Sequence, residues 1–286
     1  MDNLKAKKRH PEEIAVYSAI YVCAAFSVLL LLGIIVYVFA KGARRVNWAF
    51  LTGVTSILHG TVGIAGNILN TLIIILLTMI ITTLIGVGAA IYLNEYAKPG
   101  KLVTVIIFAT ETLAGIPSII FGLFGMLFFG QLCHMGYSLL TGSLTLTLMV
   151  LPLVTRNTQE ALKTVPDSFR TGAVGLGAGK WYTIRTILLP SAMPGIVTGV
   201  ILAIGRIIGE SAALLFTAGS AHLLPKTFDA FLEKIFHSGG TLTIQLYLSA
   251  SKGEFEVAFG IAVVLLVIVL LINFGTKRLA KKLEKH

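Results

Sequence analysis

The sequence predicts an all-helical membrane protein with six transmembrane helices and a short helical hairpin between the fourth and the fifth. The 286 residues are 56% hydrophobic and 13% charged, with a mean hydropathy of +0.88. A soluble domain of this length could not bury that much apolar surface. Apolar runs of about twenty residues recur, and in lipid such runs must be helices, which satisfy their own backbone hydrogen bonds.

The net charge of +10 does not indicate a nucleic-acid partner, because the basic residues gather at the ends of apolar runs. At those positions anionic lipid and insertion topology explain them. The first apolar run is too long for a signal-peptide core and lacks a small-x-small cleavage site, so we interpret it as a retained first span. The predicted spans cover roughly 14–40, 67–93, 102–130, 141–163, 191–217 and 256–276.

The order of these spans divides the chain into three parts. Residues 1–66 form an N-terminal cytoplasmic segment, the first span and an outer loop; residues 67–276 form the transmembrane domain; and residues 277–286 form a basic cytoplasmic tail. Within the domain the fourth span is the least apolar, and Pro152 should kink it. Sixteen Lys and Arg residues fall on the side of the termini and six on the other side. The positive-inside rule therefore places both termini in the cytoplasm.

The segment RTGAVGLGAGKWYTIRTILLP, between the fourth and fifth spans, is rich in glycine but does not fit a nucleotide-binding loop. A phosphate-binding loop needs Gly, four residues and then Gly-Lys-Ser/Thr. Here Trp181 follows Gly179 and Lys180, and Val174 stands where the first Gly should be. The dinucleotide-binding pattern fails as well, because no strand precedes the glycines.

The same segment reads better as two short helices near the inner membrane surface. Thr164 is a possible cap, Pro166 suits a first helical position, and Gly177 suits a left-handed stop. Pro190 should end or kink the second helix. From the residues alone, an interfacial hairpin that merely links two spans remains the alternative to a docking surface. Two sets of apolar residues recur at helical spacing and should each share a face, namely Phe169, Ala173 and Leu176, and then Trp181, Ile184 and Leu188.

The spacing of this segment resembles the cytoplasmic signature of type I ABC importer permeases, which is EAA, three residues, Gly, nine residues and Ile-x-Leu-Pro. Thr171-Gly172-Ala173, Gly177 and Ile187–Pro190 match that spacing, with Thr171 in place of the usual Glu and Gly172 in place of the usual Ala. The resemblance implies the type I importer permease fold, with segment 164–190 as the coupling segment that docks into a separate ATPase. The coupling residues that it implies are Phe169, Arg170, Thr171, Gly172, Ala173, Gly177, Ala178, Lys180 and Trp181.

Four further motifs look like those of A-type permease subunits of phosphate importers, the Pst system. They are LAGIPSIIFGLFG, EALKTVP, LPSAMPGI and GRIIGESAALLFTA; in the last, Ser211 and Ala213 replace the usual Thr and Pro. The resemblance implies import of inorganic phosphate across the inner membrane. The partners that it implies are a homologous C-type permease, an ABC ATPase dimer that holds the ATP and Mg²⁺, an extracytoplasmic phosphate-binding protein, and membrane lipid.

Charged residues within the predicted spans need an explanation, because each costs on the order of 2.5–3.5 kcal/mol at a helix centre. Arg206 and Glu210 lie four residues apart and should share one face, where they can pair. We expect Arg206 and Arg156 to tune an anion path, since guanidinium groups match phosphate oxygens, and Glu210 to hold Arg206 in place. An ion pair that only fixes packing is the alternative. Glu111, in the third span, is expected to be a packing partner for an arginine.

The sequence contains no grouping of nucleophile, His and carboxylate, and Cys23 and Cys133 show no metal-ligand spacing. We therefore expect no catalytic residue, metal or bound cofactor in this chain. Three alternatives stay open: an ABC permease for another oxyanion, such as molybdate or sulfate; a stand-alone secondary transporter or channel; and a non-transporting membrane scaffold.

Overall fold

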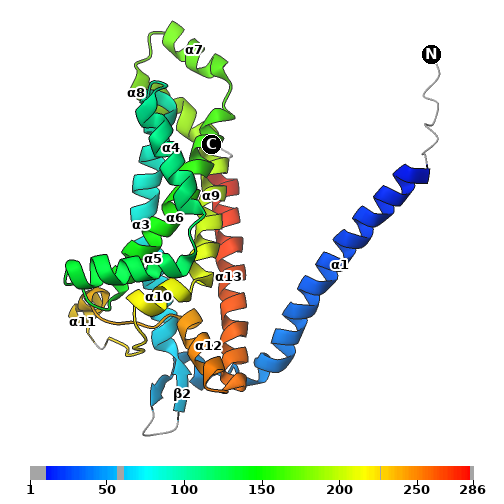
Figure 1. Ribbon diagram of the computed structural model, residues 1–286, viewed down its shortest axis with the longest axis vertical. Coiled ribbons are helices and arrows are strands. Elements are labelled where there is room, and N and C mark those ends of the chain that lie inside the picture. Colours follow the sequence, from blue (N-terminus) through cyan, green and yellow to red (C-terminus); the bar gives the residue numbers. More distant parts are fainter. Residues whose placement is uncertain (1–10, 57–60, 226, 284–286) are drawn as a thin grey trace.

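The computed structural model describes residues 11–56, 61–225 and 227–283, so the expected N-terminal segment 1–10 and the last three residues of the expected tail lie outside it. Four long helices run side by side and form the centre of the molecule (Figure 1). The central helices are α3 (Ala65–Ile91), α6 (Leu139–Lys163), α9 (Leu189–Gly209) and α13 (Phe255–Leu283).

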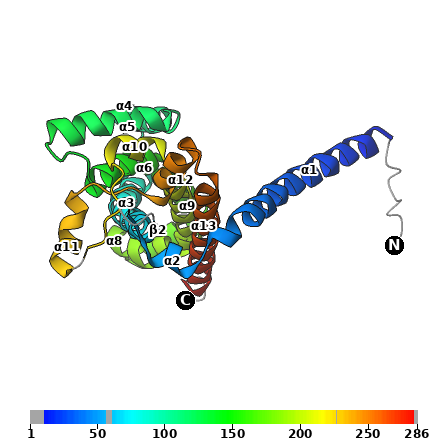
Figure 2. The same cartoon turned by 90° about the horizontal axis from the view of Figure 1, so that it is seen from below.

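The first helix, α1 (Pro11–Gly42), leaves this bundle at an angle and is exposed along most of its length (Figures 1 and 2). It touches the bundle at its C-terminal end, where the Tyr37 ring meets the Phe259 ring edge-on with centroids 5.7 Å apart. Gly42 lies directly against the backbone of Phe259, so that a side chain there would clash.

The chain then forms a one-turn 3-10 helix (Ala43–Arg45), a short helix α2 (Trp48–Thr52) and two antiparallel strands, β1 (Val54–Ser56) and β2 (Thr61–Ile64). This small hairpin is a local exception to the helical fold that we predicted. It brings Ile64 into a cluster with Phe50, Leu242, Val257 and Ile261, all fully or almost fully buried. Burial of that cluster gives the hairpin a hydrophobic anchor that two strands in water lack.

The predicted third span is broken rather than straight. Helix α4 (Lys101–Ala114) and the α5 segment (Ser118–Gly125, continued by a π-helical turn, Met126–Leu132) meet at an angle of 104°. Pro117 explains the break, because it cannot donate the next helical hydrogen bond and it disfavours helical geometry at Ile116. As a result α5 crosses the bundle instead of running along it (Figure 1).

Pro190 does not end the second helix of the coupling segment, which was one of the two outcomes expected of it. Helix α8 (Lys180–Thr183), a π-helical turn (Ile184–Leu188) and α9 form one uninterrupted helix of 30 residues, Lys180–Gly209. The wide turn ends two residues before Pro190, whose nitrogen has no hydrogen to donate. The second half of the coupling segment is therefore continuous with the predicted fifth span.

The predicted fifth span ends early, at Gly209, rather than at residue 217. Glu210 has an extended backbone, with φ −82° and ψ 124°, and a separate short helix, α10 (Ala212–Thr217), follows. The Glu210 carboxylate accepts a hydrogen bond from the backbone N–H of Ala213 (3.1 Å), so it caps the new helix. The loop after α10 contains α11 (Phe228–Glu233), a 3-10 turn (Lys234–Phe236) and α12 (Leu242–Ser251).

Five helices are long and apolar enough to cross a membrane, and the bent α4–α5 pair makes six if it counts as one span. Within the residues described, this agrees with the six predicted spans. Helix α6 is the most enclosed of them, because 67% of its most apolar window is buried. It runs continuously through Pro152 and packs between α3 and α9.

Glycines allow α9 to approach α6 closely, and Gly195 and Gly199 have the GxxxG spacing typical of close helix contacts in membranes. A Cβ at Gly199 would lie 2.7 Å from the Asn157 Cβ, whereas a Cβ at Gly205 would meet nothing within 4 Å. The first glycine pair therefore faces α6, and Gly205 and Gly209 lie on the open side of α9.

We predict that Gly199→Ala lowers the thermal unfolding midpoint of the purified chain in detergent, because overpacking a tight contact typically costs about 1–3 kcal/mol. Gly205→Ala is the matched control: it makes the same change in the same helix, gains the same helix propensity, and should leave the midpoint unchanged or raise it. Equal midpoints for the two variants would contradict the close α6–α9 contact.

Candidate functional site: a charged groove and the coupling segment

Three of the four intramembrane charges singled out from the sequence line one groove. Arg156 comes from α6, Arg206 from α9 and Glu111 from α4, and together they border a cavity of about 200 Å³. Pro152 and Met149 form its apolar wall. Helix geometry explains the meeting, because Met149, Pro152 and Arg156 lie three and four residues apart on one face of α6.

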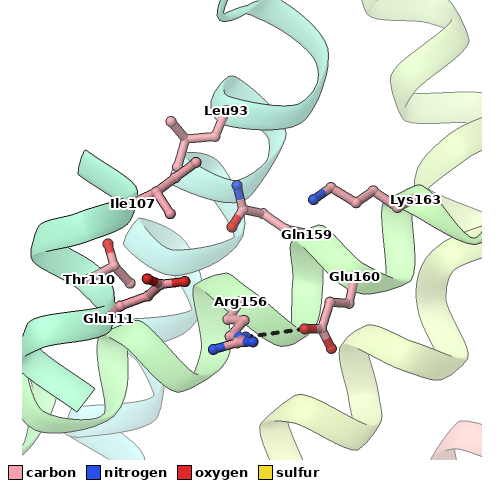
Figure 3. A pocket seen from close by; sticks show the side chains of 8 residues that line it. All are labelled: Leu93, Ile107, Thr110, Glu111, Arg156, Gln159, Glu160 and Lys163. Atoms are coloured by element: carbon pink, nitrogen blue, oxygen red, sulfur yellow. Dashed lines mark hydrogen bonds and ion pairs between the residues drawn. The ribbon is translucent and has the colours of Figure 1, made fainter. Parts of the chain in front are cut away.

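A second hollow of about 170 Å³ adjoins the first and shares Thr110, Glu111 and Arg156 with it. Figure 3 shows Glu111 and Thr110 projecting from α4 toward Arg156 and Gln159 on α6. The other residues around this hollow are Leu93, Ile107, Glu160 and Lys163. The groove is open, since Arg156, Arg206 and Glu111 are all exposed in this chain.

The charges of the groove are only partly balanced. The Nε of Arg156 donates to Oε1 of Glu160 over 3.1 Å, one turn along α6, and the two side chains are 66% and 61% exposed. An exposed pair of this kind holds its partners weakly, by about 0.3–0.5 kcal/mol. Arg206 forms no ion pair in the described part of the chain, and neither does Glu111. The Arg206 guanidinium therefore has no carboxylate partner among the described residues, and that of Arg156 can leave Glu160 at little cost.

Glu210 does not belong to this groove, and the expected pair between Arg206 and Glu210 does not form. The helix ends at Gly209, so the two residues are no longer one helical turn apart. Instead the Glu210 carboxylate caps α10, and its backbone carbonyl accepts a hydrogen bond from the Thr243 hydroxyl over 2.9 Å. Glu210 holds the break and the following loop in place.

The coupling segment begins with α7 (Asp167–Gly175), which protrudes from one end of the bundle (Figure 1). It ends in a Schellman motif: Gly177 has φ +80°, its N–H bonds the Val174 carbonyl (2.9 Å), and the Ala178 N–H bonds the Ala173 carbonyl (2.9 Å). The left-handed stop at Gly177 is as predicted. Thr164, however, caps nothing, because its hydroxyl donates to the Ala161 carbonyl behind it.

Arg170 ties this protruding helix to the rest of the protein. Its Nη2 donates to Oε1 of Glu95 over 2.9 Å, and its Nε donates to Oε2 over 3.4 Å. The same guanidinium donates to the carbonyl oxygens of Leu162 and Val165 and to the Asp167 carboxylate, each over 3.0 Å. The Arg170 and Glu95 side chains are 23% and 8% exposed, and the hydrogen bond to Glu95 raises the pKa of Arg170 above its ordinary value.

The partner of Arg170 lies in a π-helical turn, Tyr92–Tyr96, that ends α3. This turn contacts the coupling segment twice, because the Lys180 ammonium also sits over the Tyr96 ring, 4.7 Å from its centroid. The same turn contributes Leu93 to the groove around Arg156 (Figure 3). One turn of backbone thus touches both the coupling segment and the groove.

The coupling residues point in different directions. Ala173 is buried, and Arg170 and Lys180 contact the protein's own α3 end. Phe169, Leu176 and Trp181 are 46%, 92% and 59% exposed, and Val174 and Tyr182, which we did not single out, are exposed as well. The Thr171 hydroxyl donates to the backbone carbonyl oxygens of Asp167 and Ser168. Of the remaining residues, Gly172 lies within α7, and Gly177 and Ala178 form the turn that follows it.

Exposure differs within each predicted face: Ala173 is buried whereas Phe169 and Leu176 are exposed, and Ile184 and Leu188 are buried whereas Trp181 is exposed. The π-helical turn Ile184–Leu188 shifts the phase of the helix, so a wheel of 3.6 residues per turn misplaces Leu188 and the residues that follow it. The partners Glu95 and Tyr96 were also missed. A carboxylate directly after a long apolar run was the available signal for Glu95.

In the part of the chain that the structure describes, no group of three or more His, Cys, Asp or Glu side chains could hold a metal ion. Cys23 and Cys133 are both free and exposed. The polar groups that line the groove are the guanidinium groups of Arg156 and Arg206, the Glu111 carboxylate and the Thr110 hydroxyl.

Residues 82–286 match the family described as "Binding-protein-dependent transport system inner membrane component". The chain is 35% identical over 273 residues to "Probable ABC transporter permease protein YqgI" of Bacillus subtilis (strain 168), covering 92% of this chain and 93% of that protein. It is 34% identical over 244 residues to "Phosphate transport system permease protein PstA" of Xylella fastidiosa (strain Temecula1), covering 84% and 82%.

Solved transporters share the fold. The bacterial alginate ABC transporter superposes with a TM-score of 0.72 over 96% of this chain and 96% of its own, at 14% identity. The MetNI methionine ABC transporter superposes with a TM-score of 0.63 over 77% of this chain and 95% of its own, at 21% identity. With the match over residues 82–286, these findings show that the chain belongs to the family of multi-pass inner-membrane permease components of binding-protein-dependent ABC transport systems.

Proposed function

We propose that this chain is the permease subunit of an ABC importer for inorganic phosphate and forms half of the translocation path. The observation that carries the proposal is the groove in which Arg156 and Arg206, from two different helices, face one open cavity. Guanidinium groups bind phosphate oxygens through paired donors, and neither arginine is locked into a strong ion pair. The relatives named phosphate transport system permease protein PstA support the choice of anion.

The openness of the groove supports a path shared with a second permease. This chain supplies only one side of the cavity, and the charged side chains are exposed where a homologous C-type subunit would face them. An extracytoplasmic phosphate-binding protein delivers the anion, and an ABC ATPase dimer with ATP and Mg²⁺ drives the cycle. The chain itself is not catalytic, since in this family the permease and the ATPase are separate components.

The position of the coupling segment supports an insertion with both termini in the cytoplasm. The first turn of α1 and the last turn of α13 both point toward the end of the molecule that carries α7 (Figure 1). If α7 faces the ATPase, both termini lie in the cytoplasm, as the distribution of basic residues also indicates. Phe169, Leu176 and Trp181 then form the apolar surface that the ATPase covers, and Arg170 and Lys180 brace the segment from behind.

We predict that Arg206→Gln lowers phosphate uptake by about tenfold or more in proteoliposomes containing the whole transporter, because a charged hydrogen bond is worth about 1.5–3 kcal/mol. Arg206→Lys should recover part of the activity, since it keeps the charge but loses the paired donors. Lys252→Gln, which removes an exposed charge remote from the groove, is the control. Unchanged uptake in Arg206→Gln would exclude a role for the groove.

The choice of anion has its own test. ATP hydrolysis by the reconstituted transporter should rise with phosphate-loaded binding protein and stay at its basal rate with sulfate or molybdate. Stimulation by sulfate or molybdate without a response to phosphate would identify another oxyanion importer. Anion flux through this chain alone, without the ATPase, would instead identify a secondary transporter or channel.

We also predict that Arg170→Ala raises the number of ATP molecules hydrolysed per phosphate imported, because the substitution frees α7 and leaves the Glu95 carboxylate buried without its partner. The double variant Glu95→Ala/Arg170→Ala should be less impaired than the sum of the single variants, with a coupling energy of about 0.5–3 kcal/mol. Additive effects would show that the two residues act independently. The yield of folded chain in detergent separates loss of coupling from loss of folding.

A further inference from the structure

Three basic residues gather where α1 ends, at the opposite end of the bundle from the coupling segment (Figure 1). Lys41, Arg44 and Arg45 line a wide, open cavity of about 760 Å³ between the last turns of α1 and the first turns of α13. Tyr37 and Phe259 form the apolar part of its wall. The groove described above shares none of these residues.

These cations have no ion-pair partner within the described residues. None of the three forms an ion pair with a carboxylate, although Glu256 also borders the cavity. The Nε of Arg45 is buried and has no hydrogen-bond partner. A buried donor without a partner costs about 1–3 kcal/mol, so the protein's own groups leave the Arg45 guanidinium incompletely satisfied.

The Arg45 side chain is held in position before any ligand binds. Its guanidinium lies 5.8 Å from the centroid of the Phe50 ring, and its aliphatic stem packs so closely on Gly260 that a Cβ there would lie 3.1 Å from the Arg45 Cγ. A guanidinium fixed on one face by an aromatic ring presents its remaining donors in a fork that fits a phosphate group.

The position of the cavity indicates where such a phosphate comes from. The apolar length of α1 ends here, and Trp48, three residues beyond Arg45, is 79% exposed, as tryptophans are at the headgroup level of a bilayer. Phosphate groups are abundant at that depth as the headgroups of phospholipids. We propose that Lys41, Arg44 and Arg45 bind the headgroup phosphate of an anionic phospholipid between α1 and α13.

Fluorescence quenching of Trp48 tests this proposal, because the chain has two tryptophans and Trp181 lies in the coupling segment. The full chain with Trp181→Phe is placed in nanodiscs of phosphatidylcholine that contain either brominated phosphatidylglycerol or brominated phosphatidylcholine. The expected result is about fivefold preferential quenching by the anionic lipid, as roughly one retained cation contact gives. The preference should fall to near one in Lys41→Gln/Arg44→Gln, whose two side chains are exposed, and in Arg45→Gln.

Lys252→Gln is the matched control, because it removes a positive charge from an exposed side chain that does not border the cavity. The preference should survive in this variant. If the cavity variants keep the preference, or if Lys252→Gln loses it equally, the proposal is overturned, since general surface charge then explains the quenching. Loss of the preference on adding millimolar inorganic phosphate would overturn the assignment to lipid and give the site to the free anion.

Discussion

The structure depends on the enclosure of α6 between α3 and α9. Small residues make that enclosure possible: Gly86 of α3 faces Val154, and Gly195 and Gly199 of α9 face Ala161 and Asn157. In lipid there is little hydrophobic drive between helices, so such close contacts and the dispersion energy that they give hold a bundle together. Because α6 is fixed on both sides, it can serve as the reference against which the other elements are placed.

Both parts of the candidate site are built on α6. Its middle carries Pro152 and Arg156 into the groove, and the carbonyl oxygens at and just beyond its C-terminal end, those of Leu162 and Val165, accept hydrogen bonds from Arg170. A helix leaves its last carbonyl groups unpaired, so an arginine from the next segment satisfies them. The end of α6 thus supplies part of the anchor of the coupling segment, beside the Glu95 carboxylate.

The turn Tyr92–Tyr96 connects these two parts by a second route. Leu93 borders the groove, whereas Glu95 and Tyr96 contact the coupling segment. π-Helical turns inside or at the ends of helices are frequent at functional sites, because the extra residue rotates the following side chains to new directions. Residues two or three positions apart in this turn consequently face the groove on one side and the coupling segment on the other.

The helices and their order could be predicted because apolar length is a strong local signal in a membrane protein. The break at Pro117 had a local cause as well, but a single apolar run of 102–130 concealed it. The break at Glu210 was not predictable from helical spacing, because it depends on a cap and on the contact with Thr243, 33 residues away. The same holds for Arg170 and Glu95, which lie 75 residues apart and meet only in the folded chain.

The apolar row on the coupling segment has a consequence for the life of the subunit before assembly. Leu176, Trp181 and Phe169 are exposed at the end of the bundle that protrudes farthest, where none of the described helices covers them. A chain that has entered the membrane alone presents this surface to water and to any protein that recognises exposed apolar side chains. Chaperones and proteases recognise such surfaces. The amount of this subunit in a cell should therefore depend on the amount of the subunit that covers the surface.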